Sequence, residues 1–277
     1  FPPVLRGVRA IMYNSHEERA LLQALSGNQD VPGVVVGVGS DIPPSVDPAD
    51  ARARFGLDRP YFVYVGRIDV NKGCAEMFDD FEQLVVRHPH PPDLVLVGAA
   101  NMPLPDHPRI RHLGVVGERD KFNIMAGATA LVMPSYFESL SMVALEAWAV
   151  GTPVIANARC DVLVGQCLRS NAGLYYLGAE EFVGVCERLL TDTSLAERLA
   201  SNGRAYFQDQ YSWPVIERKY LDMLATLSDQ PAPHRMAPEP GWWSRKRRNL
   251  SPAEATLLGV PTGPSVDSTS VSQAGVA

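Results

Sequence analysis

Two glutamates in the middle of the chain, Glu138 and Glu146, have residue types and a spacing that suit the binding of a polar ligand. Seven residues separate them, and Glu146 is the one ionisable residue in an apolar stretch from Met142 to Val150. Apolar residues cover every face of the helix expected there, so the helix is predicted to be buried. Because a buried carboxylate is costly without partners, we expect Glu146 to meet either the donors of a ligand or an arginine in the core.

Glu138 is expected at the N-terminal mouth of the same helix. Ser139 or Ser141 is predicted to cap this helix, and Gly151 is predicted to end it. The first N–H groups of a helix have no partner inside the helix, and these groups and the helix dipole attract negative charge. We therefore expect an anion to bind beside Glu138.

These residues are expected at one edge of a parallel sheet. Apolar runs and helical patterns alternate from residue 61 onward, which predicts an α/β fold with a doubly wound parallel sheet that binds ligands beyond the carboxyl ends of its strands. The expected strands are 61–65, 93–98, 109–113, 130–133, 153–156 and 173–177, and the expected helices are 75–87, 120–126, 179–190 and 193–201, the last stopped by Gly203. Gly66, Arg67 and Lys72 follow the first of these strands and Glu138 follows the fourth, so they should share one site.

Two motifs carry a resemblance to a known family. Glu138 and Glu146, with Gly-Thr-Pro after the helix, are similar to the E-x7-E motif of retaining GT-B glycosyltransferases of family 4, the glycosyl transferases group 1. Gly66-Arg67 and Lys72-Gly73 resemble the G-R-x-x-x-x-K-G signature of the same family. The resemblance covers about residues 10–225 and implies the Rossmann-like C-terminal domain of a GT-B protein.

The resemblance implies a role for each matching position. For the sugar and the ribose, it implies that Glu138 touches the transferred sugar and that Glu146 binds the ribose hydroxyls. For the diphosphate, it implies that Arg67 and Lys72 clamp it beside Gly66 and that the backbone amides of Ser139, Leu140 and Ser141 hold it. For the base, it implies a pocket at Val115 and Val116. Two departures are visible: the family more often has glycine at 139 and 141, and Arg159, Asp161 and Asn171 stand where a glycine-rich loop is usual. We assign these last three residues no role from the sequence.

The sequence favours transfer without a metal ion. Breaking the bond between sugar and phosphate builds negative charge on the leaving group, and many transferases neutralise it with a metal held by an Asp-x-Asp triplet. No such triplet occurs in the chain, and His88, His90, His107 and His112 have no metal-ligand spacing. Two cations and a helix N-terminus can serve instead, so we expect no metal and no cofactor, with a UDP- or GDP-sugar as donor substrate.

We therefore predict a hexosyltransferase that moves a hexose from a nucleotide diphosphate sugar to an acceptor hydroxyl with retention. The acceptor is unspecified: a carbohydrate, a lipid or a small molecule. No side chain is an obvious nucleophile, which agrees with the front-face mechanism proposed for the family. The alternative is a nucleotide-sugar binding module without turnover, and a GT-B epimerase or phosphorylase is a third hypothesis.

The composition excludes some kinds of partner and of cellular location. The net charge of −6 argues against nucleic acid as a general partner, and no apolar run reaches the length of about 18 to 20 residues that spans a membrane. The four cysteines, Cys74, Cys160, Cys167 and Cys186, are dispersed among apolar and helical patterns, which is typical of reduced thiols in the cytoplasm.

The expected organisation has five parts. Residues 1–42 are interpreted as a remnant of the N-terminal acceptor domain, with strands at 9–13 and 34–38 and a capping box at Ser15 that opens a helix, and the chain as cut from something longer. Residues 43–60 form a linker with a helix at 47–55 closed by Gly56, residues 61–210 bind the nucleotide sugar, and 211–227 form a crossing helix. Gly37-Val38-Gly39 is interpreted as a plain loop and not a dinucleotide loop, because two prolines follow where a helix should open.

The end of the chain, residues 228–277, is rich in Pro, Ser, Gly and Ala and is predicted to be disordered. Within it, the aromatic and basic cluster at 242–248 has two interpretations: a solvated tail, or weak, reversible contact with an anionic membrane surface. The expected location is accordingly the cytoplasm, with a peripheral membrane position as the alternative.

Overall fold

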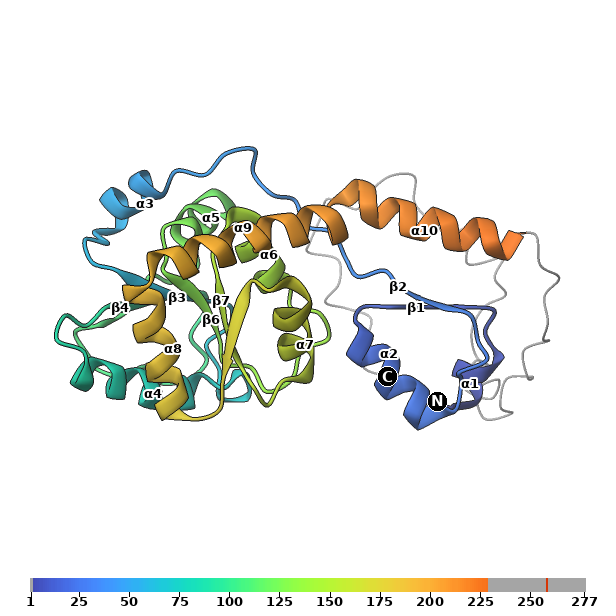
Figure 1. Ribbon diagram of the computed structural model, residues 1–277, viewed down its shortest axis with the longest axis horizontal. Helices are drawn as coiled ribbons and strands as arrows, with labels where there is room; N and C mark the ends of the chain where they lie inside the picture. The colour runs from blue at the N-terminus through green and yellow to red at the C-terminus, as the bar shows by residue number, and fades with distance from the viewer. Residues whose placement is uncertain (1, 229–257, 259–277) are drawn as a thin grey trace. The chain divides into compact units, whose positions relative to one another are not determined.

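The computed structural model describes residues 2–228 and Leu258 (Figure 1). Its main feature is a six-stranded, all-parallel sheet in the order β5-β4-β3-β6-β7-β8. The strands are β3 (Tyr61–Val65), β4 (Asp93–Val97), β5 (Ile110–His112), β6 (Ala130–Met133), β7 (Val154–Asn157) and β8 (Gly173–Tyr176). The chain builds outward from β3 in one direction and then from β6 in the other, which confirms the doubly wound sheet and puts the topological switch point between β3 and β6.

Helices cover both faces of the sheet, because the strands are apolar on both sides. Tyr61, Val63 and Val65 pack into one core, whereas Phe62 and Tyr64 pack into the other. The first core is covered by α3 (Pro48–Phe55), α5 (Glu118–Ala126), α6 (Met142–Val150), α7 (Asp161–Ser170) and α9 (Thr193–Gln210), and the second by α4 (Cys74–Arg87) and α8 (Ala179–Thr191). In Figure 1, α5, α6 and α9 lie on one side of the sheet and α4 and α8 on the other.

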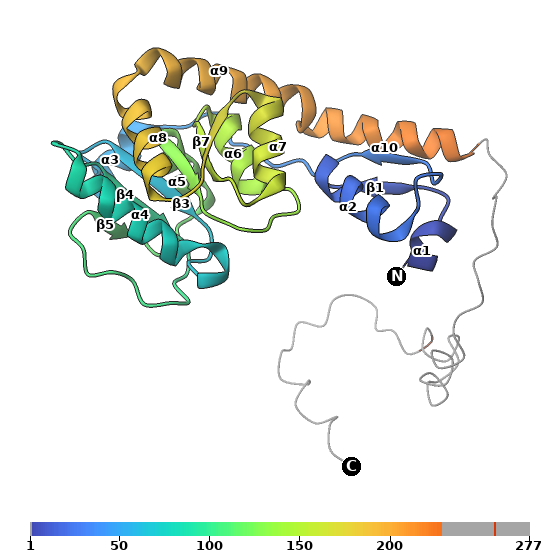
Figure 2. The ribbon, with the colours of Figure 1, turned by 60° about the horizontal axis from the view of Figure 1, so that its bottom comes forward.

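Residues 2–35 form a separate two-stranded sheet with two helices. They contain α1 (Pro2–Gly7), β1 (Ile11–Tyr13), α2 (His16–Ser26) and β2 (Gly33–Val35), and β1 and β2 pair in parallel. Half of the predicted capping box is present: the Ser15 hydroxyl accepts a hydrogen bond from Glu18 N at 3.1 Å, whereas the Glu18 carboxylate accepts from the backbone N of Asn14. The last described helix, α10 (Trp213–Ser228), runs back along β1 and β2 (Figure 2), where Arg9 donates a hydrogen bond to the carbonyl of Leu227.

The loop at Gly37–Gly39 is a plain connection, because no helix opens until α3. Gly39 lets the chain pass close to α10: a Cβ at this position would lie 2.7 Å from Cδ2 of Trp213. The Trp213 indole in turn donates to Asp41 Oδ1 at 2.8 Å. None of the described helices is long and apolar enough to cross a membrane. The predicted tail, including the cluster at 242–248, lies outside the described residues.

Two expectations about helices were wrong. The helix α7 was not predicted, although Val162, Leu163 and Cys167 of this helix pack into the core. The helix α9 was predicted to stop at Gly203 but continues to Gln210. Gly203 serves packing and not termination, because a Cβ there would lie 2.7 Å from Cδ1 of the fully buried Trp148 on α6.

We predict opposite effects for two helical glycines replaced by alanine. Gly203→Ala should lower the free energy of unfolding by about 1–2 kcal/mol, because the rigid Trp148 ring must shift. The matched control is Gly184→Ala in α8, where nothing lies within 4 Å of the new methyl group. It should raise the free energy of unfolding by about 0.5–1 kcal/mol, because alanine has the better helix propensity. Urea denaturation measures the free energy of unfolding of both variants. Changes of the same sign in the two variants would contradict the packing role of Gly203.

Candidate functional site

The loop between β3 and α4 forms one side of the site, and hydrogen bonds fix the conformation of its backbone. Asp69 caps the short 3₁₀ helix η1 (Val70–Lys72), where its Oδ1 accepts from Asn71 N at 2.9 Å. Ile68 is fully buried, and its backbone N donates to the carbonyl of Ala99 at 2.9 Å. These contacts fix the backbone on both sides of Asp69, so the side chains of Arg67 and Lys72 start from a defined frame.

Gly73 brings this loop against the end of β6. Its φ is 74°, and a Cβ at this position would lie 2.2 Å from the carbonyl oxygen of Pro134. No residue with a side chain fits there without backbone movement. The same carbonyl accepts a hydrogen bond from Nδ2 of the buried Asn157 at 3.0 Å. The ends of β3, β6 and β7 are thereby locked together at the switch point.

The packing of Gly73 against Pro134 places Lys72 and Glu138 in contact. Lys72 Nζ lies 2.8 Å from Glu138 Oε1, with side chains 34% and 14% exposed. The pair is thus within reach of solvent and of a ligand. Arg67 is more exposed, at 57%, and its Nε lies 3.5 Å from Asp69 Oδ2. The structure therefore brings Lys72 and Glu138 together, while Arg67 lies at the outer rim of the same loop.

The helix α6 begins after Glu138 without a side-chain cap. Ser141 is the N-cap residue, but its φ is 64° and its side chain makes no cap hydrogen bond. The prediction that Ser139 or Ser141 caps the helix with its side chain was therefore wrong, because a capping serine needs the extended backbone that a left-handed residue lacks. The buried Ser141 hydroxyl has no hydrogen-bond partner among the described residues. Leu140 is buried, and its carbonyl accepts from Gln166.

Glu146, in the middle of α6, has partners on both carboxylate oxygens. Oε1 accepts from the Ser40 hydroxyl at 3.0 Å, and Oε2 lies 3.1 Å from Lys121 Nζ on α5. Lys121 also contacts Glu118 at 2.8 Å. The sequence correctly indicated that this carboxylate, 8% exposed, needs donors, but the cation is a lysine and not an arginine. Ser40 was not foreseen, since 106 residues separate it from Glu146.

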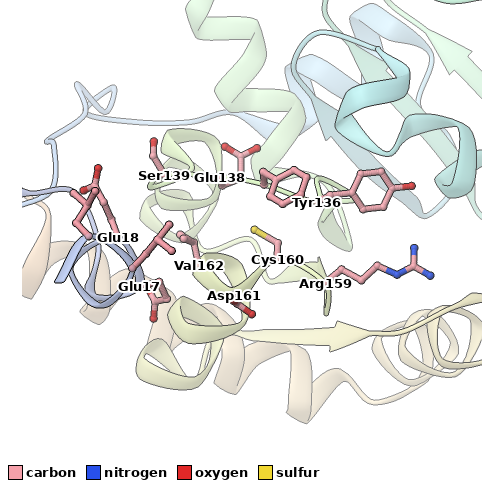
Figure 3. A pocket seen from close by; sticks show the side chains of 12 residues that line it. Glu17, Glu18, Tyr136, Glu138, Ser139, Arg159, Cys160, Asp161 and Val162 are labelled. Carbon is pink, nitrogen blue, oxygen red and sulfur yellow. The ribbon is translucent and has the colours of Figure 1, made fainter. Parts of the chain in front are cut away.

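A cavity of about 410 Å³ lies beside Glu138. It is bounded by α2, by the segment after β6 and by the start of α7. Figure 3 shows Glu138 above Cys160, with Glu17 and Glu18 on one side and Arg159 on the other. Glu138 therefore contacts its cation and also lines a space large enough for a small molecule.

Arg159, to which the sequence assigned no role, ties two loops of this cavity to α4. Its Nη1 lies 2.8 Å from Glu76 Oε2, and the Tyr136 hydroxyl donates to the same oxygen at 2.8 Å. Tyr136 precedes Glu138 by two residues, so the network restrains the segment that carries Glu138. The other two unassigned residues have local roles at the ends of α7: Asp161 lies in its first turn, and Asn171 is its left-handed C-cap.

The remaining expected residues lie apart from this network. Val115 is exposed, and Val116 packs against the core next to the end of β5. His112 Nε2 lies 2.8 Å from the Gly98 carbonyl. Among residues 2–228 and Leu258, no cluster of three or more His, Cys, Asp or Glu side chains is placed to hold a metal ion. All four cysteines are free and buried.

The sequence of the chain is similar to those of known glycosyltransferases. Residues 59–192 match the family model described as Glycosyl transferases group 1. The chain is 30% identical over 249 residues to the D-inositol 3-phosphate glycosyltransferase of Frankia alni, a match that covers 79% of this chain and 59% of that protein. It is 29% identical over 197 residues to the alpha-maltose-1-phosphate synthase of Mycobacterium tuberculosis, covering 62% of this chain and 49% of the relative. The chain thus spans about half of the length of these curated relatives.

Solved structures agree on the fold. Sucrose-phosphate synthase from Thermosynechococcus elongatus aligns with a TM-score of 0.68 at 25% identity, covering 82% of this chain and 60% of that one. Anabaena HepE, in complex with UDP, aligns with a TM-score of 0.68 at 19% identity, covering 79% of this chain and 64% of that one. Residues 59–192 are therefore similar to the glycosyl transferases group 1 family, and the sheet and its helices have the fold of these GT-B glycosyltransferase structures.

A second carboxylate on α4, that of Asp80, is buried without an ion-pair partner among the described residues. Asp80 lies one turn after Glu76, is 4% exposed, and its Oδ2 has no hydrogen-bond partner among the described residues. Burial, and then the charges of Glu76 and Asp79, raise the pKa of Asp80 from 3.8 to about 6. The folded protein therefore holds this proton more tightly than the unfolded chain does.

We predict that Asp80 makes the free energy of unfolding fall as the pH rises from about 4 to 6, because only the folded state still binds the proton in that window. Asp80→Asn should raise the free energy of unfolding by about 1–2 kcal/mol at pH 8 and by almost nothing below pH 4. The exposed neighbour offers a control, since Asp79→Asn should change it by less than about 0.5 kcal/mol. A pH-independent effect of Asp80→Asn in urea denaturation would contradict this prediction.

Proposed function

We propose that the chain transfers a hexose from a nucleotide diphosphate sugar to an acceptor hydroxyl, with retention and without a metal ion. The observation that carries the proposal is the contact of Lys72 with Glu138 at the switch point of the sheet, beside the uncapped N-terminus of α6. Doubly wound sheets bind ligands in this crevice, and cations and helix N-termini both favour phosphate. The complexes of Anabaena HepE with UDP and UDP-glucose support a UDP-sugar as the donor.

When the donor binds, its diphosphate replaces the Glu138 carboxylate as the partner of Lys72. In the proposed complex the phosphate oxygens accept from Lys72, from Arg67 and from the backbone N–H groups at the start of α6. Each charge-assisted hydrogen bond contributes about 1.5–3 kcal/mol, and the helix end about 0.3–2 kcal/mol. The released carboxylate of Glu138 then accepts hydrogen bonds from hydroxyls of the sugar, which orients its anomeric carbon toward the cavity.

The same groups assist bond cleavage. As the bond between sugar and phosphate breaks, negative charge grows on the departing oxygen, and Lys72, Arg67 and α6 stabilise it more strongly than they do the intact donor. The acceptor enters from the cavity bounded by α2 and α7, on the side of Glu138. The departing phosphate takes the proton of the acceptor hydroxyl and the new bond forms on the same face of the sugar, so the configuration is retained.

We predict that Lys72→Gln weakens UDP binding at least tenfold in calorimetric titration, because the diphosphate loses a charged donor. Arg198→Gln, which removes an exposed cation from α9, is the control and should leave the dissociation constant unchanged. Binding should also be unchanged by EDTA. Equal binding by wild type and Lys72→Gln, or loss of binding in EDTA, would contradict the proposed clamp.

We further predict that Glu146 recognises the ribose. Its carboxylate has lone pairs beyond those that Ser40 and Lys121 use, and the ribose hydroxyls would donate to them. Wild type should therefore prefer UDP over 2′-deoxy-UDP by about tenfold, the worth of one charge-assisted hydrogen bond, and Glu146→Gln should abolish most of this preference. An undiminished preference in Glu146→Gln, with a folded protein by circular dichroism, would remove Glu146 from the ribose site.

The second candidate is a nucleotide-sugar binding module without turnover; the chain covers 59% and 49% of the two relatives named above. Release of UDP from UDP-glucose, with an alkyl glucoside or water as acceptor, separates the two hypotheses, because a binding module would release none. The acceptor, the cytoplasmic location and a peripheral membrane contact stay predictions.

A further inference from the structure

A second cavity lies on the other side of α2, away from Glu138. Its volume is about 540 Å³, and its walls come from α2, β2, the end of α7, the end of α9 and α10. Helical spacing divides α2 between the two cavities: His16 and Arg19 line this one, whereas Glu18 and Leu22 line the cavity beside Glu138. The site chemistry described above uses none of the residues of this second cavity.

The charged groups of the second cavity are basic and mostly uncompensated. Arg169 forms a two-point contact with Glu17, at 2.6 and 3.1 Å. Lys219 donates to the Gln210 carbonyl at 2.9 Å and lies 5.5 Å from the centre of the Tyr211 ring, but neither contact neutralises it. Within the described part of the chain, Arg19 and Lys219 have no carboxylate within ion-pair distance. Three cations thus share one carboxylate.

His16 lines the cavity together with these three cations, and their charges act on its imidazole. Its pKa is lowered by partial burial and then by Arg169, Arg19 and Lys219, against one raising influence, the carboxylate of Glu17. Burial also lowers the pKa of Lys219. Cations from helices far apart in sequence that converge on one cavity repel one another, and a bound anion would relieve that repulsion.

We propose that this cavity binds the phosphate group of a small molecule or of a lipid headgroup. Arg19 offers a guanidinium fork that matches two phosphate oxygens, Lys219 adds a point charge, and the Tyr206 hydroxyl, 3.5 Å from that of Tyr211, is placed to donate a further hydrogen bond. The volume exceeds that of a lone phosphate, so the rest of the ligand has room against the two tyrosines. A ligand there contacts both α2 and α10 and is separate from the proposed diphosphate clamp.

The first experiment measures phosphate binding by calorimetry in Lys72→Gln protein, so that the proposed donor site does not contribute. At constant ionic strength, inorganic phosphate and glycerol 3-phosphate should bind this background. Adding Arg19→Gln and Lys219→Met should weaken binding at least tenfold. Adding Arg198→Gln and Arg218→Gln instead, which removes the same charge from exposed positions outside the cavity, should leave it unchanged. Equal losses in both variants, or binding that survives without Arg19 and Lys219, would overturn the proposal.

The second experiment needs no substitution in the cavity. The pKa of His16, followed by NMR of its ring protons, should rise on saturation with phosphate, because the anion offsets the cations that lower it. Vesicles of phosphatidylcholine with and without phosphatidylglycerol test the lipid source in parallel. A rise with soluble phosphates identifies a small-molecule site, and a rise with anionic vesicles alone identifies a headgroup site. An unchanged pKa of His16 under both conditions would overturn the proposal.

Discussion

The close approach of Gly73 to Pro134 is the constraint on which the candidate site depends. Any side chain at position 73 would collide with the Pro134 carbonyl, and that carbonyl is itself held by Asn157. The contact joins the loop after β3 to the end of β6, the two strands that flank the switch point of the sheet. Lys72 precedes Gly73 and Glu138 follows Pro134 within four residues, so their contact is a consequence of this backbone packing.

Charge satisfaction shapes the rest of the site. A cation and a carboxylate at the switch point stabilise each other until an anion competes for the cation, and the same principle keeps Glu146 paired inside an apolar helix. The sequence indicated that Lys72 and Glu138 lie together, because both follow neighbouring strands of the sheet. It did not indicate Ser40 as a partner of Glu146, because contacts across 106 residues leave no local pattern.

Local pattern explains which elements were predictable. The strands at 61–65 and 130–133 were predicted with their observed bounds, because unbroken apolar runs are typical of strands buried on both faces. The helix at 161–170 was missed because it contains Gly165 and lacks a side-chain cap. Gly165 has a tertiary reason: a Cβ there would lie 2.0 Å from the carboxylate of Glu17, which approaches from α2. Such a reason is invisible until the chain is folded.

A crystal structure of the chain with UDP would test the proposed diphosphate clamp at Lys72 directly. We expect the diphosphate to lie at the N-terminus of α6 with a phosphate oxygen on Lys72 Nζ, and Glu138 to have left its 2.8 Å contact with that amine. A diphosphate bound elsewhere, with the contact of Lys72 and Glu138 intact, would contradict it. In that case the pair would be a structural ion pair, and the basis for the proposed transfer would be lost.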